Sequence, residues 1–185
     1  MTLPLTLPID PMLAKSVEQI PTAAGYAFEP KWDGFRCIIS RDGDQITLGS
    51  RGKKPLTDYF PEVVAALADW LPDGVVLDAE LVVRAGEPGA EHLSWDALSQ
   101  RIHPAASRIA RLSAETPAEA VCFDLLATDG EDLTALPWDD RRARLEAFFA
   151  SRPDSPVIHL SRVSLAAEQA AEWFESFEGA GLDGV

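Results

Sequence analysis

The chain has 185 residues and a formal net charge of −14, with 46% apolar and 25% charged residues. These values are ordinary for a globular domain, so they argue against collagen-like, coiled-coil and disordered chains. The length suits one domain with a sizeable core, no apolar run approaches the roughly 20 residues of a membrane span, and the strong acidity argues against a generic nucleic-acid binder.

Turn residues and apolar patterns divide the first half of the chain into short strands and one helix. Residues 1–22 are rich in proline and are expected to run extended over the surface. The sequence Asp-Gly-Asp at 42–44 predicts a hairpin turn, and Pro61 stands near the favoured start of a helix over 61–71. The strands predicted in this half are 26–32, 35–40, 45–48 and 75–83.

The second half mixes strands and helices in the same way. The predicted helices are 93–102, 137–150 and 164–177, the last with Ser164 as its cap. The predicted strands are 120–127, 157–160 and 182–185. Hairpins come early and strands do not alternate regularly with helices, so we predict an α+β fold with mainly antiparallel sheets flanked by helices.

The negative charge is unevenly distributed. Residues 1–60 hold seven basic and seven acidic side chains, whereas residues 61–185 hold nine basic and 23 acidic ones. All lysines precede residue 55, so the N-terminal third is a separate electrostatic region. The two cysteines, Cys37 and Cys122, are too few for a disulfide framework and are expected to be reduced core residues of a cytosolic protein.

The segment EPKWDGFR, residues 29–36, is the most informative part of the sequence. It sets Lys31 at the end of a predicted strand, before Asp-Gly and then Arg36. A lysine held among arginines and apolar groups can act as a nucleophile. The alternative, a surface lysine beside a turn, is favoured if this short pattern is taken alone.

Four further segments carry polar or aromatic groups that could serve a site. The loop SRGKK at 50–54 could clamp phosphates or be a solvated basic loop. In VLDAEL, residues 76–81, Asp78 and Glu80 fall on one face of a strand because side chains alternate, and buried acids need a partner or a metal. Phe123 lies in a predicted strand as a stacking or core residue. Asp183 follows a pair of glycines in EGAGLD, residues 178–183, which could also be a helix-ending turn.

In this order and spacing, these segments resemble the nucleotidyltransferase motifs of ATP-dependent DNA ligases. KWDGFR at 31–36 resembles motif I, SRG at 50–52 motif Ia, DAEL at 78–81 motif III, FD at 123–124 motif IIIa and LDGV at 182–185 the start of motif IV. The sequences PMLA at 11–14 and EPK at 29–31 are most similar to the bacterial ligase C and ligase D group. The resemblance runs from about residue 11 to the last residue and implies a nucleotidyltransferase (ATP-grasp-like) adenylation fold.

The resemblance implies a role in nucleotide chemistry for five residues. Lys31 would attack the α-phosphate of ATP, release pyrophosphate and hold AMP as a phosphoramidate. Glu29 would read the adenine edge and Phe123 would stack on the base. Arg36 and Arg51 would contact ribose and phosphate oxygens, because a planar guanidinium suits anions.

The resemblance also implies metal and DNA contacts. Glu80 would hold the ribose or a metal-bound water, and with Asp183 would bind Mg²⁺ or Mn²⁺, since Mg²⁺ fits sites made of carboxylates and phosphates. Arg51, Lys53 and Lys54 would touch nucleic acid. The expected partner is nicked double-stranded DNA, with DNA repair proteins as further partners of a monomeric enzyme of the bacterial cytoplasm.

The sequence departs from the family pattern at its end. Asp183 stands where the family usually has glutamate, and the lysines of motifs IV and V are absent because the last lysine is Lys54. No oligonucleotide-binding (OB-fold) domain follows. We therefore expect residues 1–185 to be an adenylation domain that is incomplete at its C-terminus and seals nicks poorly by itself.

The leading hypothesis is the adenylation domain of an ATP-dependent DNA ligase that seals nicks in repair. Two alternatives stay open: an RNA ligase or capping-type nucleotidyltransferase, which shares K-x-D-G, and a non-catalytic nucleic-acid-binding module. The arginines of the helix over 137–150, Arg141, Arg142 and Arg144, could touch a nucleic-acid backbone. We favour instead a solvated helix face on which they pair with acids at 139, 140 and 146.

Overall fold

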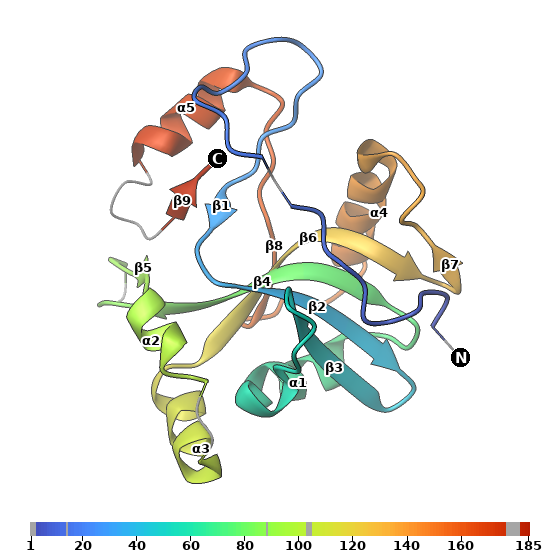
Figure 1. Cartoon of the computed structure of the whole chain (residues 1–185), viewed down its shortest axis with the longest axis vertical. Helices are drawn as coiled ribbons and strands as arrows, with labels where there is room; N and C mark the ends of the chain where they lie inside the picture. Colours follow the sequence, from blue (N-terminus) through green and yellow to red (C-terminus); the bar gives the residue numbers. More distant parts are fainter. Residues whose placement is uncertain (1–2, 14, 88, 103–104, 177–181) are drawn as a thin grey trace.

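The computed structural model describes residues 3–13, 15–87, 89–102, 105–176 and 182–185 (Figure 1). The strands are β1 (Lys31–Trp32), β2 (Phe35–Asp42), β3 (Gln45–Ser50), β4 (Val76–Ala85), β5 (His92–Leu93), β6 (Ala118–Thr128), β7 (Glu131–Asp132), β8 (Ile158–Leu160) and β9 (Leu182–Gly184). The helices are the 3₁₀-helix η1 (Thr57–Tyr59), α1 (Pro61–Trp70), α2 (Trp95–Ser99), α3 (Ala106–Glu115), α4 (Trp138–Ala150) and α5 (Ala167–Ser176). No helix in these described ranges is long and apolar enough to cross a membrane.

One large sheet organises the described part of the chain. Its path is β3-β2-β4-β6-β7, with β5 beside β4 and β8 beside β6. Its strand pairs are antiparallel, apart from the parallel pair β6–β8. β1 and β9 form a separate antiparallel pair, which lies with α5 to one side of the large sheet (Figure 1). The mainly antiparallel α+β architecture predicted from the sequence is confirmed.

The main core lies on the face of the sheet that α1 and α4 cover. Alternate residues of the central strands point into it, and Ile39 of β2, Leu77 and Leu81 of β4 and Leu125 of β6 are fully buried. Burial of each such side chain contributes roughly 1.5–3 kcal/mol to folding. The two cysteines are free and buried in the same core, as the sequence predicts, and burial raises the pKa of both thiols.

The opposite face of the sheet is divided between an apolar end and a polar end. The N-terminal segment covers the apolar end by packing four side chains against it: Leu3, Leu5, Leu7 and Ile9. This segment, expected to run extended over the surface, is therefore part of a second small core. The same face carries Arg36, Asp78 and Glu80, because Ile38 lies opposite Asp78 and Arg36 lies opposite Glu80 in the β2–β4 pair.

Two predicted elements are shorter than expected. The strand predicted at 26–32 is reduced to β1 and a single bridge between Phe28 and Ser164. Pro30 lies between them and has no N–H to donate to a ladder. The helix predicted at 93–102 is only α2, because the Ser94 side chain accepts a hydrogen bond from the Ala97 N–H and sets the helix start after β5.

Two further differences concern helices. α3 was not predicted from the sequence; it packs Leu112 inward and directs most of its other residues to solvent. The helix predicted at 164–177 is α5, which begins three residues later than predicted, at Ala167; residue 177 lies outside the described residues.

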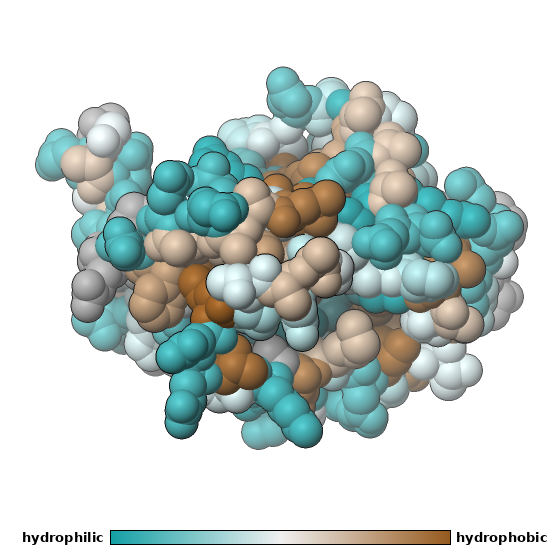
Figure 2. All heavy atoms as spheres, turned by 90° about the horizontal axis from the view of Figure 1, so that it is seen from above, coloured by the Kyte–Doolittle hydropathy of each residue, from teal (hydrophilic) through white to brown (hydrophobic). Residues whose placement is uncertain are grey.

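Several large apolar side chains remain exposed. The view from above shows apolar patches within a mostly hydrophilic surface (Figure 2). Phe174 of α5 is 57% exposed, yet a Cβ placed on Gly184 would be 3.6 Å from its ring. Phe174 thus packs α5 against β9, the strand that carries Asp183.

Candidate active site

Lys31 is positioned by the β1–β9 pair. Lys31 lies opposite Gly184, and Trp32 lies opposite Leu182. Across this pair, the Lys31 Nζ donates a hydrogen bond to Oδ2 of Asp183. The Lys31 and Asp183 side chains are 55% and 49% exposed, so a substrate can reach both.

Gly34 brings the Lys31 segment against the large sheet. A Cβ on Gly34 would overlap the backbone oxygen of Leu81 and would be 2.9 Å from Cγ of Glu80. Only glycine permits so close an approach of two backbones. The Asp-Gly pair after Lys31 therefore serves to seat this segment next to Glu80, as well as to connect β1 to β2.

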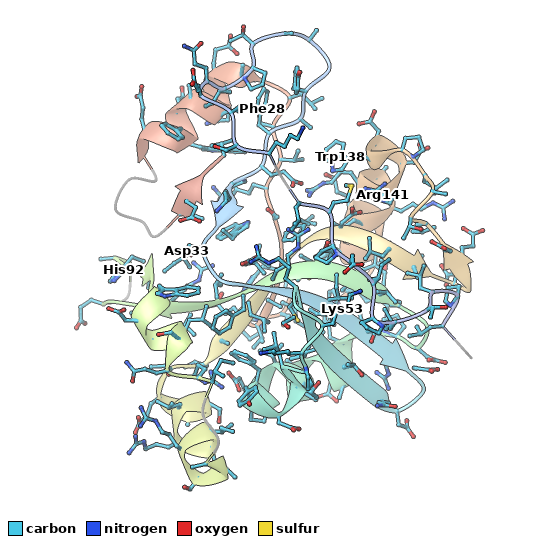
Figure 3. All side chains as sticks on the ribbon, in the orientation of Figure 1. Phe28, Asp33, Lys53, His92, Trp138 and Arg141 are labelled. Carbon is cyan, nitrogen blue, oxygen red and sulfur yellow. The ribbon has the colours of Figure 1, made fainter. Side chains whose placement is uncertain are left out.

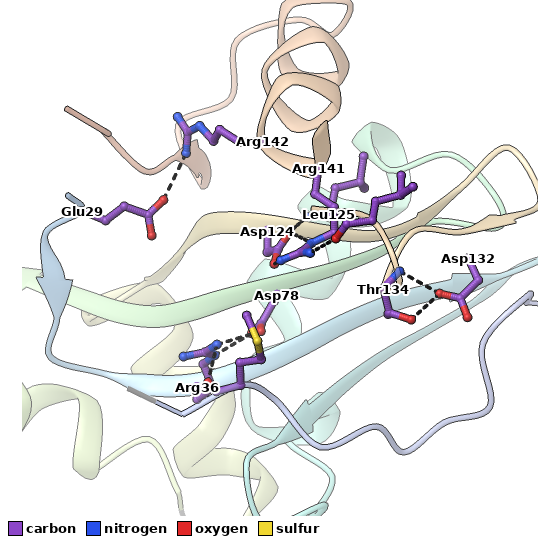
Figure 4. Close-up of polar contacts among 11 residues, drawn as sticks. Glu29, Arg36, Asp78, Asp124, Leu125, Asp132, Thr134, Arg141 and Arg142 are labelled. Carbon is purple, nitrogen blue, oxygen red and sulfur yellow. Dashed lines mark hydrogen bonds and ion pairs between the residues drawn. The ribbon is translucent and has the colours of Figure 1, made fainter. Parts of the chain in front are cut away.

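Arg36 is fixed by Asp78 on the neighbouring strand. Its Nε and Nη2 donate to the two carboxylate oxygens of Asp78 at 2.6 and 2.8 Å (Figure 4). Nη2 also donates to the backbone oxygen of Met12 at 3.3 Å. Burial raises the pKa of Asp78, and Arg36 opposes that shift. The two-point contact leaves the guanidinium little freedom to rotate.

Phe123 lies beside this ion pair. The Arg36 guanidinium carbon is 4.4 Å from the centre of the Phe123 ring, so one face of the ring is already covered by a cation. The next residue, Asp124, is held by Arg141 of α4, whose Nε and Nη2 donate to its carboxylate at 2.9 and 2.8 Å. These contacts fix the Phe123–Asp124 step of β6 in place.

Glu80 is half-buried on the polar face of the sheet that carries Arg36, and it lies within electrostatic reach of Arg36 and Lys31. Burial raises the pKa of Glu80 to about 7; Arg36 and Lys31 oppose the shift, whereas Asp78 and Asp33 add to it. Burial, with Asp183 as a further cause, also raises the pKa of Asp33, while Lys31 opposes the shift. Burial therefore shifts Glu80 and Asp33 toward their protonated forms, and the nearby Lys31 counteracts this shift in both.

Glu29 faces α4 and lies within electrostatic reach of Arg36. Its Oε1 is 3.5 Å from Nη1 of Arg142, an ion-pair distance. Burial raises the pKa of Glu29 to about 7, Arg142 and Arg36 oppose the shift, and Asp124 adds to it. Arg36 therefore lies against Phe123 and within electrostatic reach of Glu29, the two residues that the family resemblance assigns to the adenine base.

The basic loop after β3 stands apart from this cluster. Lys53 pairs with Asp10 of the N-terminal segment at 2.9 Å, and it lies away from Asp33 in the view of Figure 3. Arg51 and Lys54 are exposed. Among the described residues, the Arg51 side chain makes no hydrogen bond or ion pair with the groups around Lys31.

Sequence reasoning missed three residues that hold the site. The sequence marks Asp78 as an acid that needs a partner but does not identify that partner as Arg36. It predicts Arg141 and Arg142 on a solvated helix face, whereas both are buried. The pairing of Arg142 with Glu146 is confirmed. The expected pairing of the other arginines is wrong, because Arg141 binds Asp124 and Arg144 binds Glu131. The burial of α4 against β6 turns the first two arginines inward, and the helical pattern alone does not show that.

Glu80 and Asp183 fit a divalent cation only together with phosphate oxygens. In the described residues, no three His, Cys, Asp or Glu side chains are grouped to hold a metal. Mg²⁺ is usually bound through one or two carboxylates plus substrate phosphates. Glu80 and Asp183 would supply two such carboxylates, Glu80 in its ionised form above its raised pKa of about 7.

Residues 11–185 match the family described as ATP dependent DNA ligase domain. The chain belongs to this family. Its whole length is 50% identical to half of DNA ligase C2 from Mycolicibacterium smegmatis, and 50% identical to 51% of DNA ligase C from Mycobacterium tuberculosis. The chain thus spans about half the length of these relatives.

Solved structures of DNA ligases also resemble this chain. The chain is similar to a mycobacterial DNA ligase D complexed with ATP and MES, with a TM-score of 0.60 and 27% identity, covering 95% of this chain and 52% of that one. It is also similar to the ligase domain of M. tuberculosis DNA ligase D, with a TM-score of 0.57 and 27% identity, covering 85% of this chain and 46% of that one. The resemblance to ATP-dependent DNA ligases that the sequence motifs indicate is confirmed.

Proposed function

We propose that this chain is the adenylation domain of an ATP-dependent DNA ligase and that Lys31 is its nucleophile. The observation that carries the proposal is the position of Lys31. Its half-exposed Nζ lies next to the polar sheet face that holds Arg36 and Glu80, in a chain of the ATP-dependent DNA ligase family. The similarity to a ligase D complexed with ATP supports ATP as the nucleotide.

The first chemical step is the transfer of AMP to Lys31. The unprotonated Nζ forms a bond to the α-phosphorus, the bond from that phosphorus to the oxygen of the β-phosphate breaks, and pyrophosphate leaves with the electron pair. Asp183, already hydrogen-bonded to Nζ, is placed to take the proton that Nζ must lose before it attacks. The second proton passes to solvent as the phosphoramidate forms.

The other residues around Lys31 bind the nucleotide. Glu29 reads the adenine edge, Phe123 offers the ring face not covered by Arg36 for stacking, and Arg36 donates to ribose or phosphate oxygens. Glu80 and Asp183 would hold Mg²⁺ or Mn²⁺, which neutralises charge on the phosphates when bound.

The later steps involve DNA. AMP passes from Lys31 to the 5′-phosphate at a nick, and the 3′-hydroxyl then displaces AMP as the strands are joined. Arg51, Lys53 and Lys54 form an exposed basic loop suited to a phosphate backbone. We assign the whole protein to nick sealing in DNA repair, acting as a monomer in the bacterial cytoplasm.

Intact mass spectrometry tests the first step. Incubation with ATP and Mg²⁺ is expected to add about 329 Da, the mass of a covalent AMP, and pyrophosphate is expected to remove it. Lys31→Ala should give no adduct. An adduct formed with GTP instead of ATP would point to a capping-type enzyme, and no adduct with either nucleotide would point to a non-catalytic module.

A further inference from the structure

Arg142 has one nitrogen that its structural contacts do not use. Its Nε donates to Oε1 of Glu146 at 2.7 Å, and its Nη2 donates to the backbone oxygen of Ser161 at 2.9 Å. The side chain is only 7% exposed. Among the described residues, neither Nη1 of Arg142 nor Oε1 of Glu29 has a hydrogen-bond partner, and these two buried atoms are 3.5 Å apart (Figure 4).

The segment from Ser161 to Ser164 supports both partners of this contact. The Ser161 hydroxyl accepts a hydrogen bond from Nε1 of Trp32 at 2.9 Å, next to Lys31. The backbones of Ser164 and Phe28 exchange two hydrogen bonds, at 2.8 and 2.9 Å, next to Glu29. The same short segment therefore holds the chain on either side of Glu29 as well as the Arg142 guanidinium. These contacts hold the chain on both sides of Glu29 in place relative to Lys31.

We propose that Arg142 is a positioning residue that keeps the Glu29 carboxylate ionised and oriented, and thereby makes the site prefer a 6-amino purine to a 6-oxo purine. This inference rests on the proposed function, in which Glu29 reads the base. The exocyclic N6 of adenine donates hydrogen bonds, whereas O6 of guanine only accepts them. An ionised carboxylate only accepts and so matches adenine, but a protonated one can also donate to O6. By opposing protonation of Glu29, Arg142 disfavours guanine.

A simpler role for Arg142 is to join α4 to the Ser161 segment. The two roles differ in what they predict for nucleotide choice. A joining residue would change stability and leave the ratio of ATP to GTP use unchanged. A residue that acts through Glu29 changes that ratio, and its effect disappears when Glu29 is no longer a carboxylate.

The test compares adduct formation with ATP and with GTP in Arg142→Met and Glu29→Gln. We expect R142M to raise the KM for ATP roughly 10-fold or more, with little change in kcat, because it removes one charge-assisted interaction remote from Lys31. The ATP/GTP ratio of kcat/KM should fall. In the double variant R142M/E29Q, the fall in the ATP/GTP ratio should be smaller than the sum of the falls in the two single variants. Arg144→Met is the matched control: Arg144 is a neighbouring arginine of α4 that pairs with Glu131, and its loss should leave the ratio unchanged.

The pH profile of KM for ATP gives a second readout. The charged groups that face Glu29 are Arg142 from α4, Asp124 from β6 and Arg36 from β2. The last two are unchanged in R142M, so any shift between the profiles belongs to Arg142. In the wild type, KM should rise as pH falls through about 7, where Glu29 becomes protonated. In R142M this rise should begin at a higher pH. In E29Q, KM should depend much less on pH.

The outcomes separate this inference from the proposed function. A wild-type chain that forms no adduct with either nucleotide overturns the proposed function itself. A wild-type chain that forms the adduct, with a folded R142M that keeps the ATP/GTP ratio and pH profile, overturns only the role of Arg142. If R142M does not fold, an unchanged ratio in E29Q overturns the inference by itself.

Discussion

Lys31 and Asp183 are 152 residues apart in the chain and are joined by a hydrogen bond from Nζ to Oδ2. The contact depends on β9 lying beside β1, with Lys31 opposite Gly184. The strand that carries the proposed nucleophile is thus completed by the last described residues of the chain. This relationship places a carboxylate where it can take a proton from Nζ.

Asp183→Asn should slow formation of the AMP adduct by about 100-fold, because it removes a positioned proton acceptor from Nζ. The measurement is the rate of mass gain with ATP at fixed Mg²⁺. Asp44→Asn, which changes an exposed acid in the β2–β3 turn, should have the wild-type rate. If raising Mg²⁺ restores the rate of D183N, Asp183 acts through the metal and its role as a proton acceptor is wrong.

Gly34→Ala should disturb both stability and adduct formation. The added Cβ meets the Leu81 backbone oxygen and Cγ of Glu80, and overpacking of this kind typically costs about 1–3 kcal/mol. Urea unfolding and the adduct rate are the measurements. Gly52→Ala is the control, since a Cβ there meets nothing within 4 Å. Equal behaviour of the two variants would contradict the close approach seen at Gly34.

Glu80→Gln should stabilise the fold at alkaline pH. The folded-state pKa of Glu80 is raised from 4.5 to about 7, so the folded chain binds more protons than the unfolded one between these values, and stability falls as pH rises through that window. E80Q has no titrating carboxyl at this position, so its stability does not fall for this reason in that pH window. Its free energy of unfolding should match that of the wild type near pH 4.5 and exceed it at pH 8 by up to about 3 kcal/mol.

Added Mg²⁺ extends the same experiment. If Glu80 holds the metal, Mg²⁺ should stabilise the wild type at pH 8 more than it stabilises E80Q, because a cation bound only by the folded chain shifts the unfolding equilibrium. An equal shift in both proteins would remove Glu80 from the proposed metal site. A constant difference between the two proteins from pH 4.5 to 8, without metal, would contradict the elevated pKa.

Arg101→Met should destabilise the fold by about 3–5 kcal/mol, because it leaves the half-buried Glu62 carboxylate without its cation. Arg101 is fully buried and donates to both carboxylate oxygens of Glu62, at 2.6 and 3.0 Å. Arg111→Met is the control, since Arg111 pairs with Glu115 on an exposed helix face, where such pairs contribute at most about 1 kcal/mol. The comparison uses urea midpoints; similar midpoints would show that the buried pair has little effect.

Local patterns allowed much of the fold to be predicted. The turn at 42–44, Pro61 at the start of α1 and the alternation that puts Asp78 and Glu80 on one face all depend on neighbours within a few residues. Five motifs in order and spacing, from Lys31 to the end of the sequence, predicted the family. The sequence could not show that the N-terminal segment covers the sheet, or that α3 forms, because both depend on packing against distant elements.

The sequence by itself determined the family, through the order of five motifs along the chain, and with the family the candidate nucleophile Lys31. Its early hairpins also predicted the mainly antiparallel strands. Only the tertiary structure decided which charges meet: Arg36 with Asp78, Lys31 with Asp183, and Glu29 with Arg142. These pairs join residues on different elements, so their formation depends on strand order and helix packing. The overall acidity is only a weak argument against nucleic acid, because the excess of acids lies in residues 61–185 while residues 1–60 hold equal numbers of basic and acidic side chains.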